Sequence, residues 1–257
     1  MTVRDQQDLS KPASSESVYR DWGRLPPISR PLMQGDVFTG IALPDYDDDE
    51  QPPYIQIVMH PCNMDIAGGR LRKRIVVSPV NSTTRLGDSA WLSRKKAMPL
   101  PSLLGAGKGD FLTDLTERIS VRSSSLDLSH RVAALSDDGI LLLQQRLIMC
   151  DTRLAAKLSA LHEENRSVFA ETELQEEWLD IALDGVPEGL LNSTRISAGE
   201  EFQDWLDQEI VLETPSEADA EPAEATKTTR RATLKTVSSH SSLRRDMYRE
   251  ARFRYKS

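Results

Sequence analysis

The order of hydrophobic patterns along this chain constrains its fold more than any other feature. Apolar residues spaced by three and four begin only after Ser136. Before that point come five short apolar runs, which cover 36–42, 54–60, 74–80, 110–112 and 119–121. Strand patterns followed by helix patterns are typical of an α+β protein, because an α/β chain alternates the two.

Five short strands joined by loops favour a small barrel over an open parallel sheet. Residues 81–108 are expected to be loop, because Pro99, Pro101, Gly105 and Gly107 interrupt them. We therefore predict four segments: an irregular N-terminal arm over 1–33, a small β-barrel domain over 34–132, a helical extension over 133–212 and a disordered tail over 213–257.

The helical extension begins where the Ser136 hydroxyl can cap a helix. The stripe from Ile140 to Leu161 predicts a helix to about residue 165, broken near 151–152. A second helix is expected over 173–184. A third is expected to start at the capping box Ser197–Glu200.

Composition favours a cytoplasmic setting. The run Ile140–Leu143 is far shorter than the roughly 18 apolar residues that cross a bilayer. The first eight residues are polar, unlike the apolar centre of a secretory signal. Two cysteines, Cys62 and Cys150, imply no disulfide framework, so we expect a reducing compartment.

The net charge of −8 conceals two blocks of opposite sign near the C-terminus. Residues 200–226 carry ten acidic side chains and no basic ones, and residues 227–257 carry ten basic side chains against two acidic ones. Such blocks usually belong to solvated segments that bind each other or a partner. The predicted partner-binding residues are Arg244, Arg245, Arg249, Arg252 and Arg254.

Polar residues gather at the end of the second predicted strand, from His60 through Cys62 and Asn63 to Asp65. They could supply a nucleophile and a base, or part of a metal site. A metal site needs three or four ligands, and no second Cys/His pair with ligand spacing follows. We therefore favour a structural turn, and we predict neither a metal nor a cofactor.

Two basic clusters flank the third strand and the loop after it. If they share one side of a barrel, they could hold a phosphate backbone, although an ordinary solvated surface is the simpler interpretation. The predicted nucleic-acid-binding residues are Arg70, Arg72, Lys73, Arg74, Arg94, Lys95 and Lys96.

Three short motifs resemble the PemK/MazF-like growth-inhibitor family of toxin–antitoxin pairs. They are Gly35-Asp36-Val37, the apolar strand Ile55–Met59, and the run from Val76 to Ser82, so the resemblance covers roughly residues 34–85. It implies an SH3-like barrel that cleaves mRNA with an Arg near the second strand and a Ser or Thr after the third. The segment Ser125–Ser129 before the helices suits relatives with a helical C-terminal extension.

The residues before the second strand depart from that family pattern. Gln51-Pro52-Pro53-Tyr54 occupies the place of the expected Arg-Pro. A non-catalytic accessory protein of a bacterial multi-component system is therefore the favoured hypothesis, with a barrel and leucine stripe that dock on a protein partner and possible contact with nucleic acid through the tail.

Two alternatives stay open. The first is a toxin-like endoribonuclease, whose candidate catalytic residues are His60, Asp65, Arg72 and Ser82. The second is a homodimer built on the stripe from Ile140 to Leu161.

Overall fold

The predicted order of strands and then helices is confirmed, and the chain is an α+β protein. The computed structural model describes residues 8–23, 25–44, 46–66, 70–212, 226–235 and 240–256. The chain divides into two compact units. The sheet unit comprises Met1–Ile28, Leu32–Ile66 and Leu71–Asn165, and the helical unit comprises Ser29–Pro31, Ala67–Arg70 and Arg166–Ser257.

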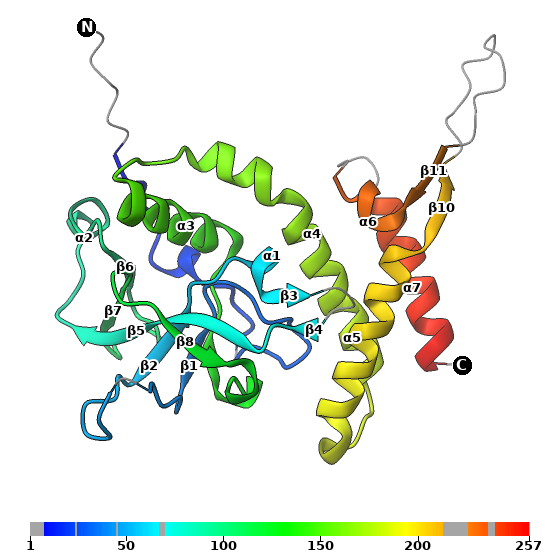
Figure 1. Cartoon of the computed structure of the whole chain (residues 1–257), viewed down its shortest axis with the longest axis horizontal. Helices are drawn as coiled ribbons and strands as arrows, with labels where there is room; N and C mark the ends of the chain where they lie inside the picture. Colours follow the sequence, from blue (N-terminus) through cyan, green and yellow to red (C-terminus); the bar gives the residue numbers. More distant parts are fainter. Residues whose placement is uncertain are drawn as a thin grey trace, which may run out of the picture. The chain divides into compact units, whose positions relative to one another are not determined.

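The sheet unit is built on a seven-stranded antiparallel sheet (Figure 1). Its neighbouring strands follow the order β6-β7-β5-β2-β1-β9, and β8 also pairs with β5. This path is open, so the described strand pairings do not form the closed barrel that we expected. The strands are β1 (Val37–Thr39), β2 (Tyr54–Ile57), β5 (Arg74–Thr83), β6 (Ala97–Leu100), β7 (Asp110–Asp114), β8 (Ile119–Arg122) and β9 (Arg131–Ala133).

The long strand β5 is the centre of this sheet. Residues 77–80 pair with β2 along one edge, while 74–77 pair with β8 and 80–83 with β7 along the other. Side chains alternate between the two faces of a strand. The apolar ones bury a core that contains Phe38, Ile55, Ile57, Ile75 and Val77.

The prediction that residues 81–108 are loop is wrong in two places. A short helix, α2, covers Ser89–Ser93, and β6 covers Ala97–Leu100. Pro99 lies within β6, which pairs only with β7 among the described strands. An edge strand tolerates proline because one row of its N–H groups needs no strand partner.

A buried ion pair joins the residue before β1 to the first residue of β9. Arg131 Nη1 donates to Asp36 Oδ2 at 2.8 Å, and neither side chain is exposed. The same carboxylate oxygen accepts the Met33 backbone N–H, and Arg131 Nη2 donates to the Pro27 carbonyl. Gly35 precedes this aspartate at φ +92°, where an added Cβ would lie 2.7 Å from Leu135.

Helix α3 (Asp137–Thr152) belongs to the sheet unit, so the unit boundary falls after residue 165 and not at 132. Ser136 caps it as predicted, accepting the Gly139 N–H at 3.0 Å. The helix also ends near the predicted break. Ile140–Leu143 are buried within this unit, so the first half of the proposed dimer stripe is core and is not available to a second chain.

Short elements complete the sheet unit. The N-terminal arm is tied to α3, since Ser136 Oγ donates to the Ser17 carbonyl at 2.6 Å. The remaining short elements are η1 (Glu16–Val18), α1 (Pro61–Met64), β3 (Asp65–Ile66), β4 (Arg70–Leu71), η2 (Ser123–Ser125) and η3 (Leu128–His130).

The helical unit takes most of its fold from three long helices. The second and third predicted helices have the wrong bounds: α4 runs unbroken over Leu158–Leu183, and α5 begins six residues before Ser197, at Leu191. Helix α5 ends at Asp207. The remaining elements are η4 (Glu188–Leu190), β10 (Glu209–Leu212), β11 (Thr226–Thr229), α6 (Arg230–Thr233) and α7 (His240–Lys256).

The prediction of a disordered tail over 213–257 is wrong for its described part. Leu243, Met247 and Ala251 lie on one face of α7 and are buried in a core with Trp178 and Trp205. The overall composition of the tail hid this spacing of four residues. Residues 213–225 and 236–239 lie outside the described residues.

We predict that Arg131→Met lowers the free energy of unfolding by about 3–5 kcal/mol, because it leaves the buried Asp36 carboxylate without its cation. Urea denaturation followed by circular dichroism measures this loss. Arg118→Met is the control, since its ion pair with Asp151 is largely exposed and should contribute under about 1 kcal/mol. Equal losses in the two variants would contradict this account.

Candidate nucleic-acid interface

An open groove of about 730 Å³ lies over β5, β6 and β7. It contains the second predicted basic cluster but none of the first. Its lining comes from β5, β7 and the α2–β6 connection, and consists of Asn81, Ser82, Thr83, Ser93, Arg94, Lys95, Lys96, Ala97, Leu112, Asp114 and Thr116.

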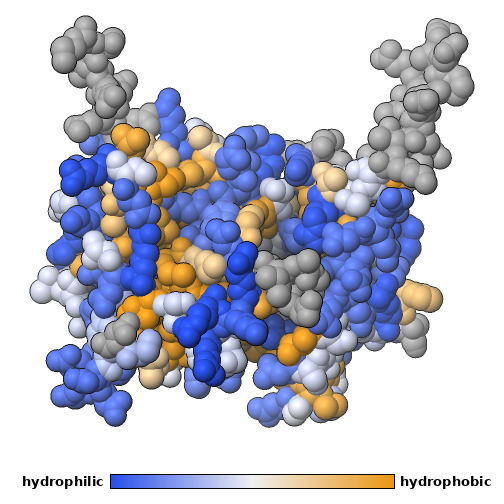
Figure 2. Space-filling model, in the orientation of Figure 1, coloured by the Kyte–Doolittle hydropathy of each residue, from blue (hydrophilic) through white to orange (hydrophobic). Residues whose placement is uncertain are grey.

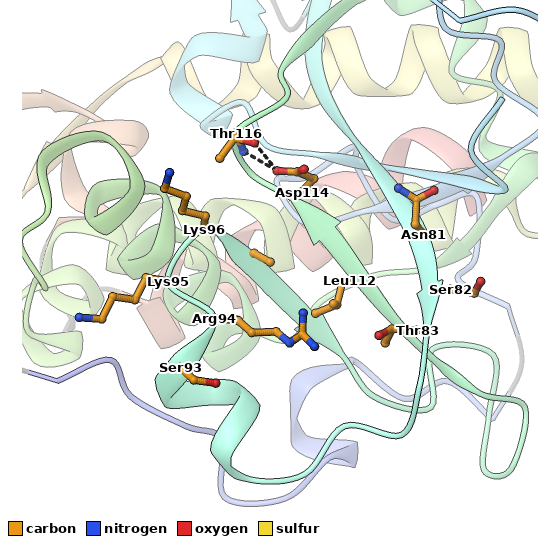
Figure 3. A pocket seen from close by; sticks show the side chains of 11 residues that line it. Asn81, Ser82, Thr83, Ser93, Arg94, Lys95, Lys96, Leu112, Asp114 and Thr116 are labelled. Atoms are coloured by element: carbon orange, nitrogen blue, oxygen red, sulfur yellow. Dashed lines mark hydrogen bonds between the residues drawn. The ribbon is translucent and has the colours of Figure 1, made fainter. Parts of the chain in front are cut away.

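Strand alternation determines which β5 side chains face the groove. Asn81 pairs with Leu112 in the sheet register, so these two lie on one face. Thr83 is two residues further along β5 and shares that face. Figure 3 shows Thr83 turned towards Leu112, whereas the Ser82 hydroxyl points away from Arg94.

The cations come from the connection between α2 and β6. Arg94 ends α2, and its backbone N–H donates to the Ala90 carbonyl at 3.1 Å. Arg94, Lys95 and Lys96 are all exposed. Arg94 reaches over Leu112 towards Thr83, while Lys95 and Lys96 extend outwards from the rim (Figure 3). The groove thus presents a guanidinium over its floor and two ammonium groups at its edge.

The lining of the groove is mostly polar. Figure 2 shows hydrophobic and hydrophilic side chains next to one another on the face of the sheet unit that it presents. Of the described residues that line the groove, only Ala97 and Leu112 are apolar. The only carboxylate in the lining is Asp114, whose Oδ1 accepts the Thr116 N–H at 2.8 Å and its hydroxyl at 2.6 Å. These bonds make Asp114 part of a turn and satisfy one of its two oxygens.

A fully buried arginine holds α2 in place beside the groove. Arg146 Nη2 donates to the Trp91 carbonyl at 2.6 Å, and the guanidinium lies 4.8 Å from the centre of the Trp91 ring. Arg146 also donates to the carbonyls of Leu142 and Ser10. Burial lowers the pKa of Arg146 to about 10, so the group is still charged at neutral pH.

His60 lies outside the groove lining, and both of its ring nitrogens are used. Asn165 Nδ2 donates to Gln144 Oε1 and to the Leu161 carbonyl, so Asn165 Oδ1 must be the acceptor for His60 Nε2 at 3.2 Å. The Cys62 backbone N–H donates to His60 Nδ1 at 3.3 Å. Both ring nitrogens of His60 therefore take part in hydrogen bonds that hold the turn before α1 and Asn165 in place.

Of the other predicted catalytic residues, Ser82 lines the groove, whereas Asp65 and Arg72 are not part of its lining. Arg72 is exposed between β4 and β5, and Asp65 begins β3. Arg74 and Ser82 lie eight residues apart on β5, which is about 26 Å along the strand. Arg74 donates instead to the Ser120 carbonyl at 3.2 Å.

The first basic cluster is therefore separate from the second. Its members Arg72, Lys73 and Arg74 are exposed, and Arg70 lies in β4. Of the predicted partner-binding residues, all on α7, Arg244 and Arg254 make ion pairs with acidic residues of the helical unit. Arg245, Arg249 and Arg252 are exposed.

In the described parts of the chain, no group of three or more His, Cys, Asp or Glu side chains could hold a metal ion. None of the helices described is both long and apolar enough to span a membrane. No protein-family model matches the chain, and no curated protein matches it.

Sequence reasoning missed Asn81, Thr83 and Arg146. Alternation along β5 would have placed Asn81 and Thr83 on one face of the strand. Which of the two faces is open follows only from the pairing of β5 with β7. Nothing in the sequence indicated that Arg146 is buried, because an arginine within a helix is usually exposed.

We predict that Arg146→Lys loosens the groove rim, because an ammonium cannot reproduce the fork of hydrogen bonds to Trp91 and Ser10. Amide hydrogen exchange should become at least about tenfold faster over residues 88–97 than elsewhere in the sheet unit. Arg153→Lys, at the exposed end of the same helix, serves as the control. Unchanged exchange over 88–97 would show that Arg146 does not position α2.

Proposed function

We propose that this chain is a non-catalytic interaction protein whose groove over β5, β6 and β7 binds the phosphate backbone of single-stranded RNA. The observation that carries the proposal is that Arg94, Lys95 and Lys96 line the same open groove as Asn81 and Thr83. Guanidinium, ammonium, amide and hydroxyl groups all donate hydrogen bonds to phosphate oxygens.

The groove suits a chain of phosphates better than a single small anion. It is open and about 730 Å³ in volume, and its cations are spread along one rim. When a polyanion binds, each phosphate that contacts a cation of the protein releases condensed counterions into the solvent. This release increases the affinity with every further contact. The chain as a whole is acidic, at −8, so the attraction has to come from local clusters of cations such as this one.

The positions of the candidate catalytic groups support a binding role. Cleavage of RNA by general acid–base catalysis needs a group that can take the proton of the attacking hydroxyl. Both nitrogens of His60 are engaged, and no histidine lines the groove among the described residues. Asp114, its only carboxylate, is held in a turn by Thr116.

A toxin-like endoribonuclease is the second candidate. It is favoured by one observation: Arg94 and the Thr83 hydroxyl are turned towards the same space (Figure 3). This candidate includes the finer proposal that the sheet is a divergent, partly open SH3-like barrel of the PemK/MazF type. The central role of β5, which pairs with three other strands, supports that comparison.

Two further parts of the hypothesis stay predictions. One is docking on a protein partner as an accessory component of a bacterial system. The other is a cytoplasmic location, which is supported by Cys62 and Cys150, since neither forms a disulfide within the described residues.

We predict that Arg94→Gln/Lys95→Gln/Lys96→Gln weakens RNA binding at least about tenfold and reduces the salt slope of log K by about 2, since each lost phosphate contact removes roughly 0.7. Fluorescence anisotropy with a labelled 20-nucleotide mixed-sequence RNA measures both quantities. Arg72→Gln/Lys73→Gln/Arg74→Gln makes the same charge change outside the groove and serves as the control. Equal weakening by the two triple variants would overturn the assignment of the groove.

A second prediction separates binding from cleavage. The purified chain should leave the same RNA intact over several hours, with and without divalent cations, because Asp114, the one carboxylate among the described lining residues, is held in a turn by Thr116. Denaturing gel electrophoresis measures the intact fraction. Cleavage that Thr83→Val or Arg94→Gln abolishes would establish the endoribonuclease instead.

A further inference from the structure

The outer face of α7 differs from its inner face in how its charges are balanced. On the inner side, Leu243, Met247 and Ala251 are buried in the aromatic core of the helical unit. At 100° per residue, Arg245, Arg249 and Arg252 fall on the opposite side within an arc of about 60°. We call these three residues the arginine stripe.

The other cations of α7 are matched by neighbouring acids. Arg244 pairs with Glu177 at 2.7 Å, Arg254 with Glu250 at 2.8 Å, and Lys256 with Asp184 at 2.6 Å. Glu177 and Asp184 lie before the acidic block 200–226, and Glu250 lies on α7 itself, so these contacts do not pair the two charge blocks of the sequence. They hold the helix to its own unit.

The arginine stripe has no such match. Within the described residues, none of its three members makes an ion pair with a carboxylate, and all three are exposed. Arg245 and Arg249 are four residues apart, and Arg249 and Arg252 are three apart. Like charges at these spacings destabilise a helix, so the stripe does not serve the stability of α7.

Two aromatic side chains flank the stripe. Phe253 is 72% exposed, more than any other large hydrophobic residue among those described, and Tyr248 is 36% exposed. Arginines beside accessible rings match single-stranded nucleic acid, because guanidinium groups bind its phosphates and rings stack on its bases. An acidic protein surface would use the arginines but not the rings.

We propose that the outer face of α7, formed by Arg245, Arg249 and Arg252 with Phe253 and Tyr248, is a second binding surface for single-stranded nucleic acid. The stripe extends about 10 Å along the helix axis, enough to contact successive phosphates of one strand. This inference adds a surface in the helical unit to the proposed function. It does not depend on the groove in the sheet unit.

Fluorescence anisotropy of a labelled 20-nucleotide mixed-sequence RNA, titrated with the whole chain, tests this surface. Arg245→Gln/Arg249→Gln/Arg252→Gln should weaken binding at least about fivefold and reduce the salt slope by about 2. Phe253→Ala should weaken binding about tenfold and leave the salt slope unchanged, because stacking releases no counterions. Circular dichroism confirms that each variant keeps its helix content.

A matched control and a combined variant separate this surface from the groove. Lys108→Gln/Lys157→Gln/Lys235→Gln removes three exposed cations from outside both surfaces and should change affinity less than twofold. The α7 triple variant should weaken binding further when added to the groove triple variant. If the groove triple has no effect and the α7 triple does, the groove assignment fails and the α7 surface stands.

Two results would overturn the proposal. One is an α7 triple variant that binds RNA as tightly as the charge-matched control. The other is binding of a polyglutamate peptide to the wild-type chain that the α7 triple variant loses while its RNA affinity stays the same. This result would assign the stripe to an acidic protein partner.

Discussion

The buried ion pair between Asp36 and Arg131 is the interaction on which the sheet unit depends most. It joins β1 to β9, the strand at one end of the sheet, and its remaining hydrogen bonds hold the backbone at Met33 and Pro27. Both charges are fully buried, so each stabilises the fold only while the other is present. Gly35 allows the close approach of Leu135 just before this pair. The Gly-Asp-Val motif is therefore a structural requirement of this sheet.

A second buried arginine connects that scaffold to the surface. Arg146 comes from α3, yet it binds the carbonyl and the ring of Trp91 in α2, the helix that ends at Arg94. Its charge is satisfied by carbonyl oxygens, and none of its hydrogen-bond partners among the described residues is a carboxylate. The same helix thus contributes to the core and sets the position of the groove's cations. Such preorganisation lowers the cost of ordering side chains when a ligand binds.

Much of the architecture could be predicted from the sequence, and the errors of that prediction have physical causes. The strand runs around Val37, Ile55 and Val77 and the capped start of α3 at Ser136 follow from local patterns. β6 was missed because proline is tolerated at a sheet edge. α7 was missed because Leu243 and Met247 are few among many charges, and their burial depends on partners over forty residues away.

The candidate site was harder to predict than the fold. The sequence identified Arg94, Lys95 and Lys96 but grouped them with the first basic cluster at 70–74, because proximity along the chain is a poor guide to which residues share a face. Thr83 replaced Ser82 on the open side only once the register with β7 was known. His60 was weighed as a base, and its hydrogen bonds to Asn165 and Cys62 assign it to structure.

The most direct test of the account is a map of amide chemical-shift changes in the full-length chain on titration with a single-stranded RNA oligonucleotide. The account predicts that, within the sheet unit, the changes concentrate at residues 81–83, 93–97 and 112–116. Changes centred on 60–65 and 72–74, with none along the groove, would contradict it.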